Sequence, residues 1–101
     1  MTMIPLPADL AGAPLDELKQ WLAISGTQDD ALLTRILGSA FQVCIQFTGL
    51  EPGDWLTLDE ALRHGIIRFA AHNYRERDLG NSDSIPAAVT ALWRPWRKMR
   101  L

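Results

Sequence analysis

The two histidines of the chain, His64 and His72, are the first candidates for chemistry because they share one face of a predicted helix with Arg68 and Arg75. Imidazole nitrogens are common metal ligands. The two histidines are eight residues apart, which is ~12 Å along a helix and too far for one metal ion without outside ligands. We therefore predict no metal site. The stripe is interpreted as a solvated or subunit-facing basic surface, with Arg68 and Arg75 as subunit-interface candidates.

Other sequence motifs indicate no catalytic chemistry. The sequence has no glycine-rich phosphate loop, no G-x-S-x-G nucleophile elbow and no H-E-x-x-H zinc motif. Two carboxylate pairs, Asp29-Asp30 and Asp59-Glu60, consist of adjacent residues, which point away from each other on a helix. The single cysteine, Cys44, lies on an apolar helix face and is predicted to be a buried hydrophobe. We predict no catalytic residue, no cofactor and no enzymatic activity.

The element that organises these side chains is a long helix predicted over Thr27 to Thr48, the longest periodic run of the sequence. Its apolar arc covers more than half of the circumference, whereas one docking face needs only ~100°. We therefore expect this helix to contact more than one neighbour, and Ile45, at the edge of the arc, is a candidate for a subunit contact. Thr27 is the expected N-cap and Gly49 the expected C-cap.

A shorter helix is predicted before it. Residues 1–13 show no periodicity and are interpreted as an N-terminal arm. Pro14 suits the first position of a helix, and Gly26 is the expected C-cap. Its apolar face consists of four large side chains, which are Leu15, Leu18, Trp21 and Leu22.

Two further helices complete the prediction. Thr57 and Glu60 have the spacing of a capping box, and the helix that they open continues to about Arg77, antiparallel to the central helix. Trp55, in the loop between the two helices, is expected to pack on the edge of the core. A fourth helix begins near Pro86, carries Val89, Leu92 and Trp93 inward and stops at Pro95, which disfavours helical geometry for Arg94.

The predicted fold is all-α, a small bundle of about four helices with a long central helical hairpin and an extended C-terminal tail. We divide the chain into an N-terminal arm (1–13), a helical domain (14–93) and a basic, aromatic tail (94–101). The length of 101 residues suits one domain. No run approaches the ~20 apolar residues of a membrane span, and the N-terminus has no basic segment, so a soluble, unexported protein is expected.

Charge is distributed unevenly along the chain. Residues 1–60 carry two bases and nine acids, a net charge of −7, and residues 61–101 carry eight bases and three acids, a net charge of +5. Two interpretations remain open. Either the monomer is self-complementary, or the basic part of one copy meets the acidic part of the next in a head-to-tail interface. Asp29 and Asp30 are then interface candidates.

The C-terminal segment alternates cations with large apolar side chains, a pattern typical of a segment that anchors in a partner's groove. Its residues are Trp93, Arg94, Trp96, Arg97, Lys98, Met99, Arg100 and Leu101. They are the candidate partner-binding residues. The alternative interpretation is a frayed basic terminus.

The order of four segments resembles the small head-tail connector proteins, also called adaptor or head-completion proteins, of long-tailed phages and gene transfer agents. The segments are PLDELKQWLAI, GTQDDALLTRILGSAFQVCIQFTG, RFAAHNYRERD and IPAAVTALWRPWRKMRL. The resemblance covers the chain from about Leu15 to Leu101. It departs from the family pattern in the tryptophan-rich close and in the Trp55 loop.

The resemblance implies a homo-oligomeric ring beneath the portal, usually with the portal's twelve-fold symmetry, that joins capsid to tail. The expected partners are the portal protein, a tail-side neck or stopper protein, further copies of the chain and, passively, the DNA in the channel; no membrane is involved. The expected location is the particle neck, with assembly in the host cytoplasm. The alternative function is a small helical protein-interaction module or nucleic-acid-binding regulator that uses Arg68, Arg75 and the tail.

Overall fold

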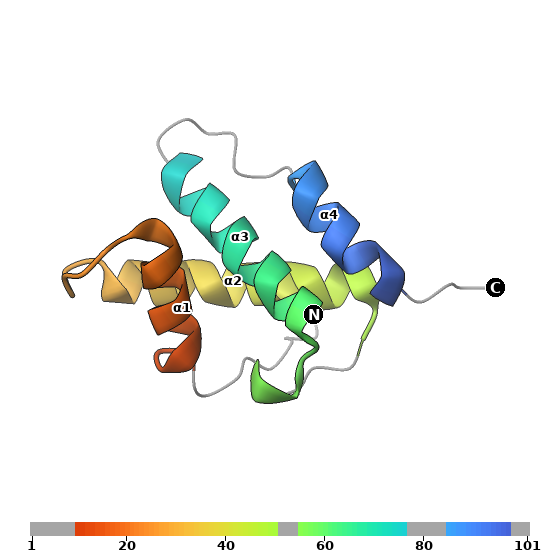
Figure 1. The fold of residues 1–101 in the computed structure, drawn as a ribbon, viewed down its shortest axis with the longest axis horizontal. Helices are drawn as coiled ribbons and strands as arrows, with labels where there is room; N and C mark the ends of the chain where they lie inside the picture. The colour runs from red at the N-terminus through yellow and green to blue at the C-terminus, as the bar shows by residue number, and fades with distance from the viewer. Residues whose placement is uncertain (1–9, 51–54, 77–84, 98–101) are drawn as a thin grey trace, which may run out of the picture.

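The computed structural model describes residues 10–50, 55–76 and 85–97, and within these ranges it contains helices and no strand (Figure 1). The elements are α1 (Ala13–Leu22), α2 (Asp30–Thr48), the 3-10 helix η1 (Trp55–Thr57), α3 (Glu60–Glu76), α4 (Ala87–Trp93) and the 3-10 helix η2 (Arg94–Trp96). The all-α prediction is confirmed.

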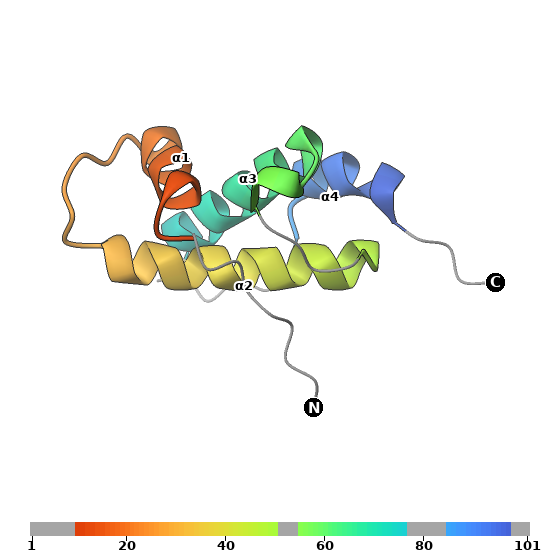
Figure 2. The ribbon, with the colours of Figure 1, turned by 90° about the horizontal axis from the view of Figure 1, so that it is seen from below.

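The helices form two layers. Figure 2 shows that α1, α3 and α4 lie on the same side of α2, which runs along the length of the molecule. The helix α3 runs back obliquely across α2, and it packs on α2, α1 and α4. The predicted hairpin of α2 and α3 is therefore present, and each of these two helices also packs on α1 and α4.

The core is built on one face of α2. Leu33, Leu37, Phe41 and Cys44 are fully buried there, as the apolar arc predicts. Ile45 is also in this core, with only 5% of its surface exposed, so little of it is accessible to a neighbouring subunit. The apolar side chains of this helix that the subunit only partly covers share one flank by helical spacing and are Leu32, Ile36, Val43 and Phe47.

The two ends of α2 differ in how well the sequence predicts them. Gly49 ends the helix in the left-handed conformation (φ 73°), and its N–H donates to the Ile45 carbonyl at 2.8 Å, as predicted. The helix begins at Asp30 rather than after Thr27, because the chain first makes a turn in which the Asp30 N–H donates to the Thr27 carbonyl at 3.2 Å. Asp29 takes the N-cap position.

The end predicted for α1 is wrong. The helix ends at Leu22, and Ala23, not Gly26, adopts the left-handed conformation (φ 59°) that closes it. The amide groups of Ala23 and Ile24 donate to the carbonyls of Gln20 and Lys19. These bonds cap the helix, and an alanine at such a position bears a steric cost of about 1–2 kcal/mol.

The start of α3 also lies later than predicted. Thr57 belongs to η1, and α3 begins at Glu60, the residue expected to be the third position of the helix. The Asp59 carboxylate accepts a hydrogen bond from the Ala61 N–H at 3.3 Å. Trp55 is completely buried, so it is part of the core and not only a cover on its edge.

Pro95 does not end the helical conformation. The structure places Arg94 in right-handed helical geometry (φ −56°, ψ −41°), which corrects the prediction, and the chain continues as η2 through Trp96. Proline is tolerated there because the first turn of a helix needs no N–H donor. Residues 94–96 of the predicted extended tail are therefore 3-10 helical, and Arg97 itself has extended geometry (φ −70°, ψ 124°).

By length and composition α2 meets the criteria for a membrane-spanning helix, with a mean hydropathy of 1.2 over 18 residues. The expectation that no run approaches a membrane span therefore does not hold for α2 by these criteria. The core helix of a soluble protein meets the same criteria, and α2 packs against three other helices on one side.

Candidate assembly surfaces

Trp93 is an internal anchor and not an exposed partner-binding residue. Its side chain is fully buried, its indole N–H donates to the Leu62 carbonyl at 3.3 Å, and its ring meets that of Phe69 edge-on, with centroids 6.0 Å apart. The Trp93 ring can lie this close to α3 because Gly65 has no side chain. A Cβ atom at position 65 would lie 2.8 Å from Cδ1 and 2.9 Å from Cε2 of Trp93.

The segment that follows Trp93 is accessible. Arg94 and Arg97 are exposed, and Trp96 is half-buried against the core. The Arg97 guanidinium lies 5.1 Å from the centre of the Phe47 ring, a cation-π arrangement that holds the start of the tail against α2. The remaining predicted partner-binding residues, 98–101, lie outside the described residues.

The carboxylates predicted as interface candidates at the start of α2 have partners within the subunit. The Tyr74 hydroxyl donates to Asp29 Oδ2 at 2.7 Å, which ties α3 to the turn before α2. Lys19 Nζ forms a salt bridge with Asp30 Oδ1 at 2.8 Å, which ties α1 to α2. Both carboxylates thus contribute to the fold of a single copy, and a role between subunits stays a prediction.

Trp21, assigned by its spacing to the apolar face of α1, is 42% exposed and lies across the basic face of α3. Its ring meets His64 edge-on, with centroids 5.4 Å apart and an interplanar angle of 80°, and the Arg68 guanidinium lies 5.8 Å from the ring centre. The exposed indole separates two surface hollows. Helical spacing did not indicate this position, because it places Trp21 on the same face as Leu18.

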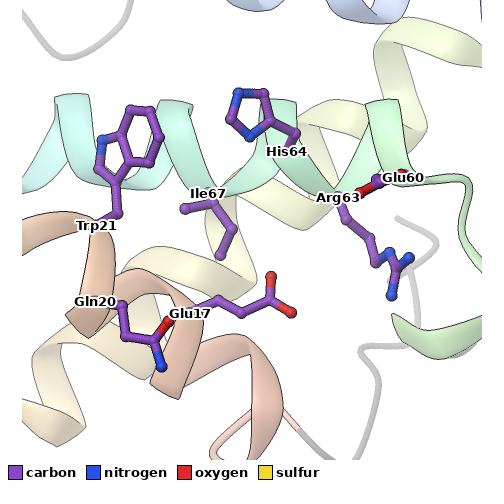
Figure 3. A pocket seen from close by; sticks show the side chains of 7 residues that line it. All are labelled: Glu17, Gln20, Trp21, Glu60, Arg63, His64 and Ile67. Carbon is purple, nitrogen blue, oxygen red and sulfur yellow. The ribbon is translucent and has the colours of Figure 1, made fainter.

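The first hollow lies between α1 and the N-terminal half of α3 and has a volume of about 450 Å³ (Figure 3). Its lining residues are Glu17, Gln20, Trp21, Glu60, Arg63, His64 and Ile67. In this view the Glu17 side chain extends from α1 into the space below Ile67, whereas Gln20 points away from α3. Charges of both signs line this hollow, so it has no preference for a partner of one charge.

The second hollow lies on the other side of Trp21 and has a volume of about 300 Å³. We call it the basic hollow, and its lining residues are Trp21, Arg68, His72, Arg75, Glu76, Pro86, Ala88 and Val89. The ionisable residues of this lining are two arginines, one histidine and one glutamate, so basic residues predominate. The structure therefore brings together Arg68, His72 and Arg75 of the predicted basic stripe, whereas His64 lies on the far side of Trp21.

Leu56, in η1, is the most exposed large apolar side chain among the described residues, at 72% exposed. Asp59 and Glu60 follow it and are also exposed. We call these three residues the acidic knob. Composition did not distinguish Leu56 from its fully buried neighbour Trp55, since in a 3-10 turn the packing of the flanking helices decides which side chain turns inward.

The described residues offer little for catalysis. Among them, no group of three His, Cys, Asp or Glu side chains is placed to hold a metal ion. Cys44 is fully buried, as predicted, and burial raises the pKa of its thiol from 9.0 to about 12, so the nucleophilic thiolate is scarce at neutral pH. The accessible features are surfaces that suit contact with other proteins.

Comparison with known proteins identifies one family. A family model described as phage gp6-like head-tail connector protein matches residues 13–97. The match spans every helix from α1 to η2. No curated protein and no solved structure matches the chain.

Proposed function

The chain belongs to the phage gp6-like head-tail connector family, and we propose that identical copies form a ring beneath the portal that joins capsid to tail and surrounds the DNA channel. The family match over residues 13–97 is the observation that carries this proposal. Members of this family are structural proteins of the head-tail junction. Beyond this family role, we infer that the copies form a ring with the portal's twelve-fold symmetry and that this ring surrounds the channel.

The C-terminal segment is the proposed portal contact. Arg94 and Arg97 are exposed beside the half-buried Trp96, and four more residues of basic and apolar type follow them in the sequence. Trp93 supports this role indirectly, because its buried ring fixes the point at which the segment leaves α4. The tail-side partner, a neck or stopper protein, would bind another surface of the ring.

Contact with DNA is proposed to be passive. The net charge of the chain is −2, so the protein as a whole does not attract phosphates. A nucleic-acid-binding regulator, the alternative function, would bind free duplex DNA with a steep dependence on salt. A connector should show little binding to free duplex at physiological salt, and a filter-binding or anisotropy titration separates the two functions.

The portal contact is tested with two variants that leave the described core intact. One ends at Arg97, which removes residues 98–101, and the other is the charge reversal Arg94→Glu with Arg97→Glu. We expect both to keep the helical circular dichroism spectrum and to fail to co-sediment with portal-containing heads. Arg35→Glu is the control, since Arg35 is exposed on α2 and introduces one charge reversal of the same kind away from the tail.

Electron micrographs of heads incubated with the wild-type protein provide the second readout. A ring at the portal vertex is expected. Normal attachment of both C-terminal variants would refute the portal contact, and attachment of the wild type without any ring density would refute the ring.

A further inference from the structure

We propose that the acidic knob of one copy, with Leu56 at its tip, seats in the basic hollow beside Trp21 of the next copy. This inference rests on the proposed ring and names its subunit contact. It assigns one occupant to the hollow, a second copy of the same chain.

The knob has the character of an inserted anchor. Leu56 is 72% exposed, although large apolar side chains are costly to leave in water. Asp59 and Glu60 follow it three and four residues later and are also exposed, and residues 51–60 contain four acids and no base. An apolar tip among carboxylates suits a site that combines an apolar floor with cations.

The basic hollow has that combination. Pro86, Ala88 and Val89 supply apolar surface from the start of α4, and Arg68, His72 and Arg75 supply cations from α3. The exposed Trp21 indole forms one wall. Partly buried charge pairs across such a contact favour correct pairing and exclude like-charged partners.

The two surfaces lie on different sides of the subunit. In Figure 1, η1 is at the lower edge of the molecule, whereas the C-terminal half of α3 and the start of α4 are at the upper edge. A knob therefore does not reach the hollow of its own subunit. A contact between two different surfaces is heterologous, and repetition of a heterologous contact closes a ring when the rotation permits. The uneven distribution of charge along the chain favours the same kind of head-to-tail contact.

Disulfide trapping tests the contact directly. The double variant Leu56→Cys with Ala88→Cys places one thiol on the knob and one on the exposed rim of the hollow. The buried Cys44 does not compete in mild oxidation. The control is Ser39→Cys with Ala88→Cys, which keeps the hollow thiol and moves the other to an exposed position of α2. Both are assembled on portal-containing heads and oxidised.

We expect a ladder of covalent oligomers from the knob variant and none from the control. If micrographs show rings but the knob variant stays monomeric after oxidation, or if both variants form ladders equally, the inference is overturned and the ring stands. If the wild-type protein forms no ring on heads, the proposed function fails, and the inference fails with it.

Charge exchange provides an independent test. Leu56→Lys places a cation against the basic hollow, and we expect each contact to weaken about tenfold or more. Arg75→Glu in the same chain should restore part of the ring yield, because the new lysine then meets a carboxylate. Both positions are exposed, so folding is unaffected. Unchanged ring yield for Leu56→Lys, or no gain from Arg75→Glu, would contradict the contact.

Discussion

Replacement of Gly65 by alanine should destabilise the protein although alanine is the better helix former. The new Cβ atom would lie within 3 Å of the Trp93 ring, which is fully buried and cannot swing into solvent. The ring must shift, and its N–H then loses the Leu62 carbonyl that it meets at 3.3 Å.

The magnitude follows from three contributions. Overpacking costs about 1–3 kcal/mol, and a buried N–H without its acceptor costs about 1–3 kcal/mol. The higher helix propensity of alanine relative to glycine offsets up to about 1 kcal/mol of this loss. We expect the free energy of unfolding to fall by about 2–4 kcal/mol, which for a domain of this size lowers the Tm by roughly 10–25 °C.

Urea denaturation followed by far-ultraviolet circular dichroism measures this loss. Gly26→Ala is the matched control, because no atom lies within 4 Å of the position where its Cβ would be. That control should change stability by less than about 0.5 kcal/mol. Trp93→Phe should soften the effect of Gly65→Ala, with a coupling of about 1–2 kcal/mol in a double-mutant cycle. Equal stability of the Gly65→Ala and Gly26→Ala proteins would refute the proposed fit of Trp93 against Gly65.

Two smaller predictions concern Ala23 and Cys44. Ala23→Gly should raise the free energy of unfolding by about 0.5–1 kcal/mol, because glycine adopts the left-handed C-cap conformation without steric cost; a lower urea midpoint would contradict this explanation of the cap. The folded protein holds the Cys44 proton more tightly than the unfolded chain does, since burial raises the thiol pKa from 9.0 to about 12. Stability should therefore fall above pH 9 by up to about 1.4 kcal/mol per pH unit relative to Cys44→Ala, and parallel pH profiles of the two proteins would argue against a buried thiol.

The helices themselves could be predicted from the sequence because their apolar spacing is regular. Leu33, Leu37, Phe41 and Cys44 of α2 recur at helical intervals, and the structure buries all four. Helix ends were less predictable. An alanine caps α1, where a glycine three residues later offered the stronger signal.

The candidate surfaces could be predicted only in part. The basic stripe gave Arg68, His72 and Arg75 correctly as neighbours, because all three are on one helix. Trp93 was assigned to partner binding because it adjoins the basic tail, yet its environment depends on Gly65 in another helix. Leu56 and Trp21 were missed for a similar reason, since their exposure follows from how α1, η1 and α3 pack and not from local spacing.

The basic hollow also lies between α1 and α4. Trp21 borders it from α1, and Ala88 and Val89 border it from α4, while α1 and α4 make most of their packing contacts with α3. In a free subunit either terminal helix can therefore open locally with limited effect on the other. A neighbouring copy seated between them would bridge the two helices, and its binding free energy would then oppose the opening of both. Assembly would thus turn a subunit with two independently fluctuating ends into one cooperative unit.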